Sequence, residues 1–100
     1  MQAHYDAAFD REQGVTEPEW RQMLPQALDG YSWRHTGPGA AEITIDAGRL
    51  QLGWTVLPPR QIALIRMPRL AVQYRFEGVS DAARQAFMKR FDLYIQRGGG

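Results

Sequence analysis

The chain has 100 residues, of which 44% are hydrophobic, and it carries 12 basic and 11 acidic side chains but no cysteine. That length fits one domain with one hydrophobic core, and the lack of cysteine excludes disulfides, thiolate metal sites and thiol nucleophiles. No apolar stretch approaches the ~20 residues needed to span a bilayer, and the amino terminus lacks the basic and apolar regions of a signal peptide. We therefore expect a soluble cytoplasmic protein without membrane contact.

The small net charge of +1 hides an uneven distribution along the chain. Residues 1–30 carry six acids and two arginines, whereas residues 31–100 carry five acids and ten bases. Eleven of the twelve bases are arginine, which binds carboxylates and phosphates in a bidentate manner that lysine cannot match. Solubility and codon bias explain this pattern; an acidic first element lying against a basic sheet is the alternative.

The first elements are a lead-in and a helix. Residues 1–15 show no clear apolar period, so we expect them to be mobile. Thr16 and Glu19 have the spacing of a capping box, which predicts that a helix begins there. The apolar stripe of this helix covers residues 20–28, although Pro25 predicts a kink or a break in its second half.

Short apolar alternations between residues 31 and 76 predict an antiparallel sheet with one dry and one wet face. Glycine and proline turns, including a corner at Pro58-Pro59, separate the expected strands, which are 31–36, 42–46, 50–56, 61–67 and 69–76. Strands joined by short turns tend to be neighbours, so the pattern predicts a meander of four to five strands.

A second helix is expected after Gly78, with Ser80 as its cap and Arg97 at its end, followed by a flexible tail at residues 98–100. Each helix has one apolar stripe, and both can cover the same face of the sheet. The sequence therefore predicts an α+β fold, a two-layer sandwich with element order α-β-β-β-β-β-α, in which residues 1–100 form a single domain.

No residue pattern predicts a catalytic, metal or cofactor site. His4 lies near Asp6 and Asp10 in sequence, but a flexible terminus offers a metal no fixed geometry. His35 is expected to pack at a strand end, and it becomes a candidate base only if the fold brings an acid beside it. We therefore expect no cofactor, and the sequence favours a protein without catalytic activity while leaving an enzyme as the open alternative.

The remaining candidate is a surface. In the predicted meander, the strand at 61–67 lies between two strands that expose polar side chains, which leaves a small apolar centre within a polar rim. The candidate partner surface consists of Gln51, Thr55, Ala63, Ile65, Met67, Arg69, Gln73 and Arg75. A one-residue change of register would instead expose Ile62 and Leu64, and both alternatives remain open.

These observations favour a small protein-interaction or accessory module that binds a protein partner or a second copy of itself. The alternative is a nucleic-acid-binding module that uses an arginine-rich sheet face. In that alternative the phosphates would meet Arg34, Arg60, Arg66, Arg69 and Arg75, and bases would stack on Trp33, Trp54 or Tyr74. The sequence pI of about 8.2 is low for such a module. A ligand pocket near His35, Trp33 and Trp54 is a third hypothesis.

Overall fold

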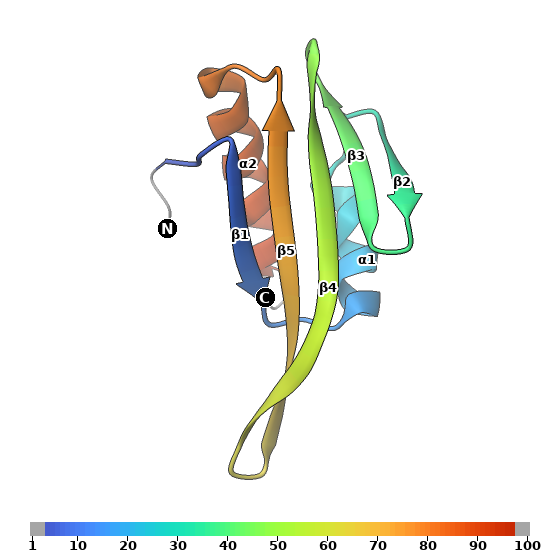
Figure 1. The fold of residues 1–100 in the computed structure, drawn as a ribbon, viewed down its shortest axis with the longest axis vertical. Coiled ribbons are helices and arrows are strands. Elements are labelled where there is room, and N and C mark those ends of the chain that lie inside the picture. The colour runs from blue at the N-terminus through green and yellow to red at the C-terminus, as the bar shows by residue number, and fades with distance from the viewer. Residues whose placement is uncertain (1–3, 98–100) are drawn as a thin grey trace.

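In the computed structural model, which describes residues 4–97, a five-stranded sheet is covered on one face by two helices (Figure 1). The elements in chain order are β1 (Ala8–Gln13), α1 (Glu17–Ala27), β2 (Trp33–Gly37), β3 (Ala40–Ile45), β4 (Gly48–Ile62), β5 (Ile65–Glu77) and α2 (Asp81–Arg97). All strand pairs are antiparallel, and the order across the sheet is β1-β5-β4-β3-β2. The predicted two-layer α+β sandwich is confirmed.

The structure differs from the sequence prediction at the amino terminus. Residues 8–13, part of the predicted mobile lead-in, form β1 at the edge of the sheet beside β5. Its inward positions are Phe9, Arg11 and Gln13, so only one of the three is apolar and the usual strand pattern is missing. One strand therefore precedes the first helix. Residues 1–3 and the predicted tail at 98–100 lie outside the described residues.

The second difference concerns the long strands β4 and β5. The predicted corner at Pro58-Pro59 is wrong, because β4 continues to Ile62 and a register shift between Leu57 and Arg60 takes up the two prolines. Proline cannot donate a ladder hydrogen bond, and a bulge or strand edge is where a sheet tolerates it. Residues 61–67 therefore form the tip of a hairpin between β4 and β5, not a separate central strand.

Helix α1 begins at the predicted capping box. The Glu19 amide donates to Thr16 Oγ1 at 3.2 Å, and the Thr16 amide donates to Glu19 Oε1 at 2.9 Å. Pro25 lies in the last turn of the helix, which continues for two residues beyond it. Of the predicted kink or break at Pro25, the break does not occur.

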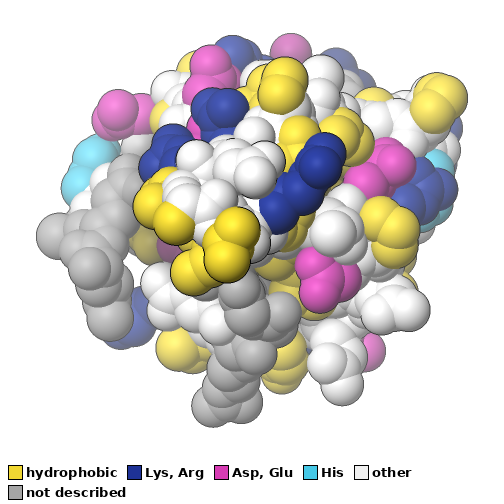
Figure 2. All heavy atoms as spheres, turned by 90° about the horizontal axis from the view of Figure 1, so that it is seen from below, with side chains coloured by type: hydrophobic (Ala, Val, Ile, Leu, Met, Phe, Trp, Pro, Cys, Tyr) yellow, Lys and Arg dark blue, Asp and Glu magenta, His cyan; other side chains and the backbone are white. Residues whose placement is uncertain are grey.

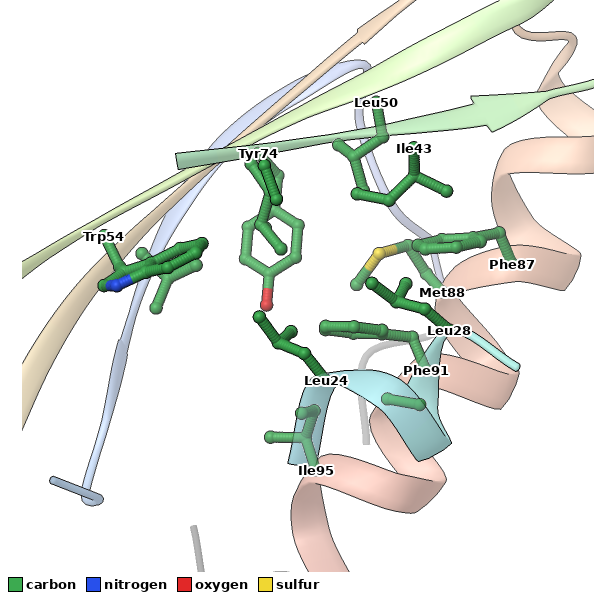
Figure 3. Close-up of a cluster of buried hydrophobic side chains, with 14 of the residues drawn as sticks. Leu24, Leu28, Ile43, Leu50, Trp54, Tyr74, Phe87, Met88, Phe91 and Ile95 are labelled. Carbon is green, nitrogen blue, oxygen red and sulfur yellow. The ribbon is translucent and has the colours of Figure 1, made fainter. Parts of the chain in front are cut away.

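The core fills the space between the sheet and the two helices (Figure 3). Trp20 of α1 connects the layers, with ring centroids 5.9 Å from Trp54 of β4 and 6.1 Å from Phe91 of α2. The inward positions of β3, β4 and β5 are buried, namely Ala41, Ile43, Ile45, Leu50, Leu52, Trp54, Leu70, Val72, Tyr74 and Phe76. Because burying one large apolar side chain is worth about 1.5–3 kcal/mol, this face fixes the register of the sheet.

Candidate functional site

The sheet face opposite the helices, here called the open face, carries the five polar members of the candidate surface. Gln51 lies directly across from Arg75, and Gln73 lies across from Gly53. Thr55 and Arg69 occupy the same face further along β4 and β5. The apolar members lie elsewhere: Ala63, Ile65 and Met67 belong to the hairpin tip. The predicted apolar centre within a polar rim is therefore wrong, because β4 pairs directly with β5 and no strand separates them.

The arginines of the open face are paired with carboxylates. Arg75 lies 2.9 Å from Asp10, and Arg34 lies 3.3 Å from Glu42. Glu42 also accepts a hydrogen bond from Gln51, so these polar side chains connect β2, β3 and β4. In each pair the guanidinium and the carboxylate neutralise each other at short range, so little net positive potential is left on this face.

This pairing bears on the nucleic-acid alternative. Of the five arginines in that hypothesis, four form ion pairs, and Arg66 is the one without an ion pair among residues 4–97. The aromatic candidates do not face the same way: Trp54 and Tyr74 are buried against the helices, and Trp33 is half-buried. Within residues 4–97, the open face thus lacks both the unpaired cations and the exposed rings that single-stranded nucleic-acid binding uses.

The most unusual surface is the distal part of the β4–β5 hairpin, residues 56–68, here called the arm. Strand β3 accompanies β4 only as far as Gly53, and β1 accompanies β5 only as far as Leu70. Beyond these points the two strands pair only with each other and extend past the rest of the sheet (Figure 1). A two-stranded ribbon without a supporting layer is marginally stable in water, so such an arm is expected to gain order when another surface covers it.

The arm is also where apolar side chains meet solvent. Among the described residues, six large hydrophobic side chains are exposed, and all but Leu93 belong to the arm: Val56 (61% exposed), Ile62 (55%), Leu64 (98%), Ile65 (62%) and Met67 (42%). Figure 2 views the molecule from the end where the arm lies and shows hydrophobic side chains gathered there beside Lys and Arg side chains. Scattered exposed apolar residues are ordinary, but a concentration on one projecting element marks a contact surface.

The base of the arm is tied to β1 by ion pairs. Glu12 lies 2.7 Å from Arg69 and 3.5 Å from Arg60. The hydrogen bond from Arg69 lowers the pKa of Glu12 below its usual range, so this carboxylate stays charged at neutral pH. These contacts orient the arm relative to the sheet, while its tip is left without such support.

A hollow of about 350 Å³ lies where the arm meets the start of α1. Its apolar walls include Val15 and Pro18 at the start of α1 and Val56, Pro59 and Pro68 from the arm. Glu17 and Arg69, the latter paired with Glu12, also line it. The hollow is therefore mostly apolar and is suited to aliphatic side chains rather than to a charged ligand.

A second, polar hollow of about 450 Å³ lies at the opposite end of the sheet and brings Glu42 and Glu77 to either side of Arg49. Arg49 Nε donates to Glu77 Oε1 at 2.7 Å, and Arg49 Nη1 lies 3.9 Å from Glu42 Oε2. The hydrogen bond to Glu77 raises the pKa of Arg49. Arg49 thus holds both carboxylates in ion pairs at this hollow.

The ring of His35 packs beside two tryptophans. His35 is exposed and makes edge contacts with Trp33 and Trp54, at centroid distances of 5.2 and 6.2 Å. Trp54 directs its Nε1 to Glu17 at 3.0 Å rather than into an open pocket. Among residues 4–97 no group of three His, Asp or Glu side chains has an arrangement that could hold a metal ion.

The candidate surface named Ala63, Ile65 and Met67 of the arm, and its register alternative named Ile62 and Leu64. In the structure the four large side chains among these are all exposed, so both alternatives are partly met. Arg66 was named only for nucleic-acid binding, and the exposure of Val56 was not predicted. A signal was present in the sequence: residues 61–67 are apolar on both strand faces and are flanked by prolines. Only two helices were available to cover the sheet, so one face of such a strand had to remain open or project from the fold.

Comparison with known proteins gives no family for this chain. No protein-family model matches it, and a search of curated proteins gives no significant match. Within the described part of the chain, neither helix combines the length and hydropathy needed to cross a bilayer.

Proposed function

We propose that the protein is a small cytoplasmic interaction module, without catalytic activity of its own, that binds a partner protein through the arm. The observation that supports this is the concentration of exposed apolar side chains on residues 56–68, a segment that the rest of the fold does not cover. Leaving these side chains in water forfeits free energy that a contact would recover, at about 25 cal/mol per Å² of apolar area covered.

The composition of the arm agrees with this role. Protein contact surfaces combine an apolar centre with arginine and methionine, and they are poor in acidic residues. The arm contains Met67, Arg60 and Arg66 and has no acidic residue. Its tip residue Leu64 is almost fully exposed and is the natural anchor, because a few central side chains supply most of the affinity in such contacts.

Site-specific photo-cross-linking in the producing cells tests the proposal. A photoreactive side chain at position 64 is expected to give covalent adducts with protein, whereas the same group at position 93 is expected to give none. Leu93 is the matched control because it is an exposed leucine, 51% accessible, on α2. Adding Ile65→Glu or Met67→Glu should remove the adducts while the circular dichroism spectrum stays unchanged.

Equal adduct yields at positions 64 and 93, or the absence of adducts at position 64, would contradict the proposal. The alternative function, nucleic-acid binding, is separated by a salt titration on the same protein. Phosphate contacts weaken steeply as salt rises, whereas an apolar contact does not.

A further inference from the structure

The arm and the hollow at its base have complementary surfaces. The tip presents Ile62, Leu64 and Ile65, and the hollow is lined chiefly by valine and proline side chains. The hollow belongs to the same hairpin but lies several residues from the tip, roughly 20 Å at ~3.3 Å per residue, so a tip cannot enter its own hollow. A tip can therefore fill only the hollow of another molecule.

The charges of the arm and of the residues beside the hollow also favour contact between two molecules. The arm carries arginines and no acid, and Arg66, two residues beyond the tip, makes no ion pair among residues 4–97. The hollow is bordered by the first turn of α1, which carries Glu17 and the exposed Glu19. A tip seated in the hollow of a second molecule would bring its Arg66 towards these carboxylates.

We propose that the partner of the arm is a second copy of this chain, and that the two arms lie antiparallel across a twofold axis. Each tip then occupies the hollow at the base of the other arm. This inference rests on the proposed function and names its partner. One tip-to-base contact, repeated by the twofold axis, closes the assembly and leaves neither tip nor hollow free, which is the usual logic of a homodimer.

The contact is made by side chains rather than by extending the sheet. Pro58, Pro59 and Pro68 lie along the two edges of the arm and lack the N–H group that a joined strand would need. Prolines therefore oppose open-ended strand addition, while their rings add apolar surface to the hollow. This favours a closed dimer over a fibre.

Because the chain contains no cysteine, disulfide mapping gives a sharp test. Leu64→Cys and Pro18→Cys are purified separately, mixed and exposed to a mild oxidant. A disulfide requires Cα atoms within about 7 Å, so the mixture should form a dimer, whereas each variant alone should not. Leu93→Cys replaces Leu64→Cys in the control mixture and should stay monomeric on a non-reducing gel.

Charge reversal provides an independent measurement by sedimentation of the full chain. Arg66→Glu should weaken self-association about tenfold or more, since it places like charges together. Leu93→Glu should leave the dissociation constant unchanged.

Several results would overturn the second copy as the partner. The first is a monomer at all concentrations. The second is cross-linking of Leu64→Cys with itself, which indicates a tip-to-tip contact. The third is binding of the arm to lipid vesicles in place of self-association. The photo-cross-linking test distinguishes a failure of the dimer proposal from a failure of the proposed interaction through the arm. Adducts at position 64 whose mass differs from twice 11.4 kDa would retain the arm as a contact site but with another partner.

Discussion

Arg11 of β1 and Asp92 of α2 form a bidentate ion pair, with Nη2–Oδ1 at 2.6 Å and Nη1–Oδ2 at 2.9 Å, between residues 81 positions apart in sequence. The same carboxylate accepts a hydrogen bond from Tyr5 Oη at 2.5 Å, and Arg11 also donates to Tyr74 Oη at 3.0 Å. Burial opposes the charge of Arg11, but the hydrogen bonds to Asp92 and Tyr74 outweigh it and raise the pKa of Arg11. This cluster fastens the edge strand to the last helix.

Removing one partner of this pair should destabilise the fold strongly. Asp92→Asn leaves the guanidinium of Arg11 without its counter-charge in a site that is 22% exposed. We expect the free energy of unfolding, measured by urea titration, to fall by about 3 kcal/mol. The double variant Arg11→Met/Asp92→Leu should recover much of this loss, because it removes both charges together.

The surface pair Arg75–Asp10 is the matched control, since it also connects β1 with β5 but is largely exposed. Asp10→Asn should cost less than about 1 kcal/mol. Equal losses for Asp10→Asn and Asp92→Asn would contradict the structural role assigned to the buried pair.

The two tyrosines of the cluster predict a loss of stability at alkaline pH. Burial raises the pKa of Tyr74 to about 12, and burial together with the hydrogen bond to Asp92 raises that of Tyr5 to about 12, from an ordinary value of 10.0. A pKa that is higher in the folded state gives stability that is complete below pH 10 and is lost as the pH rises towards 12. The free energy of unfolding should fall in this window by about 1.4 kcal/mol per pH unit for each tyrosine.

Urea titrations across this pH range check the prediction. Tyr5→Phe should make the decline about half as steep, because one of the two groups no longer ionises. An unfolding free energy that stays level between pH 10 and pH 12 would exclude the role of these hydroxyl groups.

Strand β1 shows why part of the fold escaped prediction. The central strands bury apolar side chains at every second position, so the alternation of apolar and polar residues can be recognised in the sequence. In β1 the inward Arg11 is accommodated only because Asp92 and Tyr74 lie beside it, and both are far away in sequence. A polar residue that is buried through a distant partner has no local signal.

The arm was half predicted for a related reason. The sequence left open whether Ile65 and Met67 or Ile62 and Leu64 are exposed, and in the structure all four are exposed. The position of these side chains depends on whether Pro58-Pro59 turns the chain or lies in a bulge. Proline lacks a backbone N–H group and is tolerated in either place. The pairing of β4 with β5 decides between the turn and the bulge, and the local sequence does not encode this pairing.

Gly48 should tolerate no larger residue. It begins β4 against the end of β5, and an added Cβ would lie 2.3 Å from the carbonyl oxygen of Gly78 and 2.4 Å from that of Glu77. Backbone atoms cannot move aside as a side chain can, so the strands would have to separate. We expect Gly48→Ala to cost about 3 kcal/mol in urea titrations.

Gly14 provides the control, because nothing lies within 4 Å of an added Cβ there. Gly14→Ala should change the free energy of unfolding by less than about 0.5 kcal/mol. A neutral Gly48→Ala would show that the close approach of β4 to Gly78 is absent in solution.

The turn of the arm carries backbone strain that a substitution can relieve. Ala63 has φ 54°, in the left-handed region, within a two-residue turn closed by the pair Ile62–Ile65. Glycine adopts this conformation without the Cβ penalty, so Ala63→Gly should stabilise the turn by about 1 kcal/mol. The arm pairs only with itself, so it can open without global unfolding, and amide hydrogen exchange of residues 56–68 is the appropriate measurement. Exchange in the arm should slow several-fold while the core amides of β4 and β5 stay unchanged.

Asp46 has φ 53° in the turn between β3 and β4, but aspartate tolerates that region, so Asp46→Gly should give a smaller effect. Faster exchange in the arm of Ala63→Gly would mean that the turn does not hold Ala63 in this conformation.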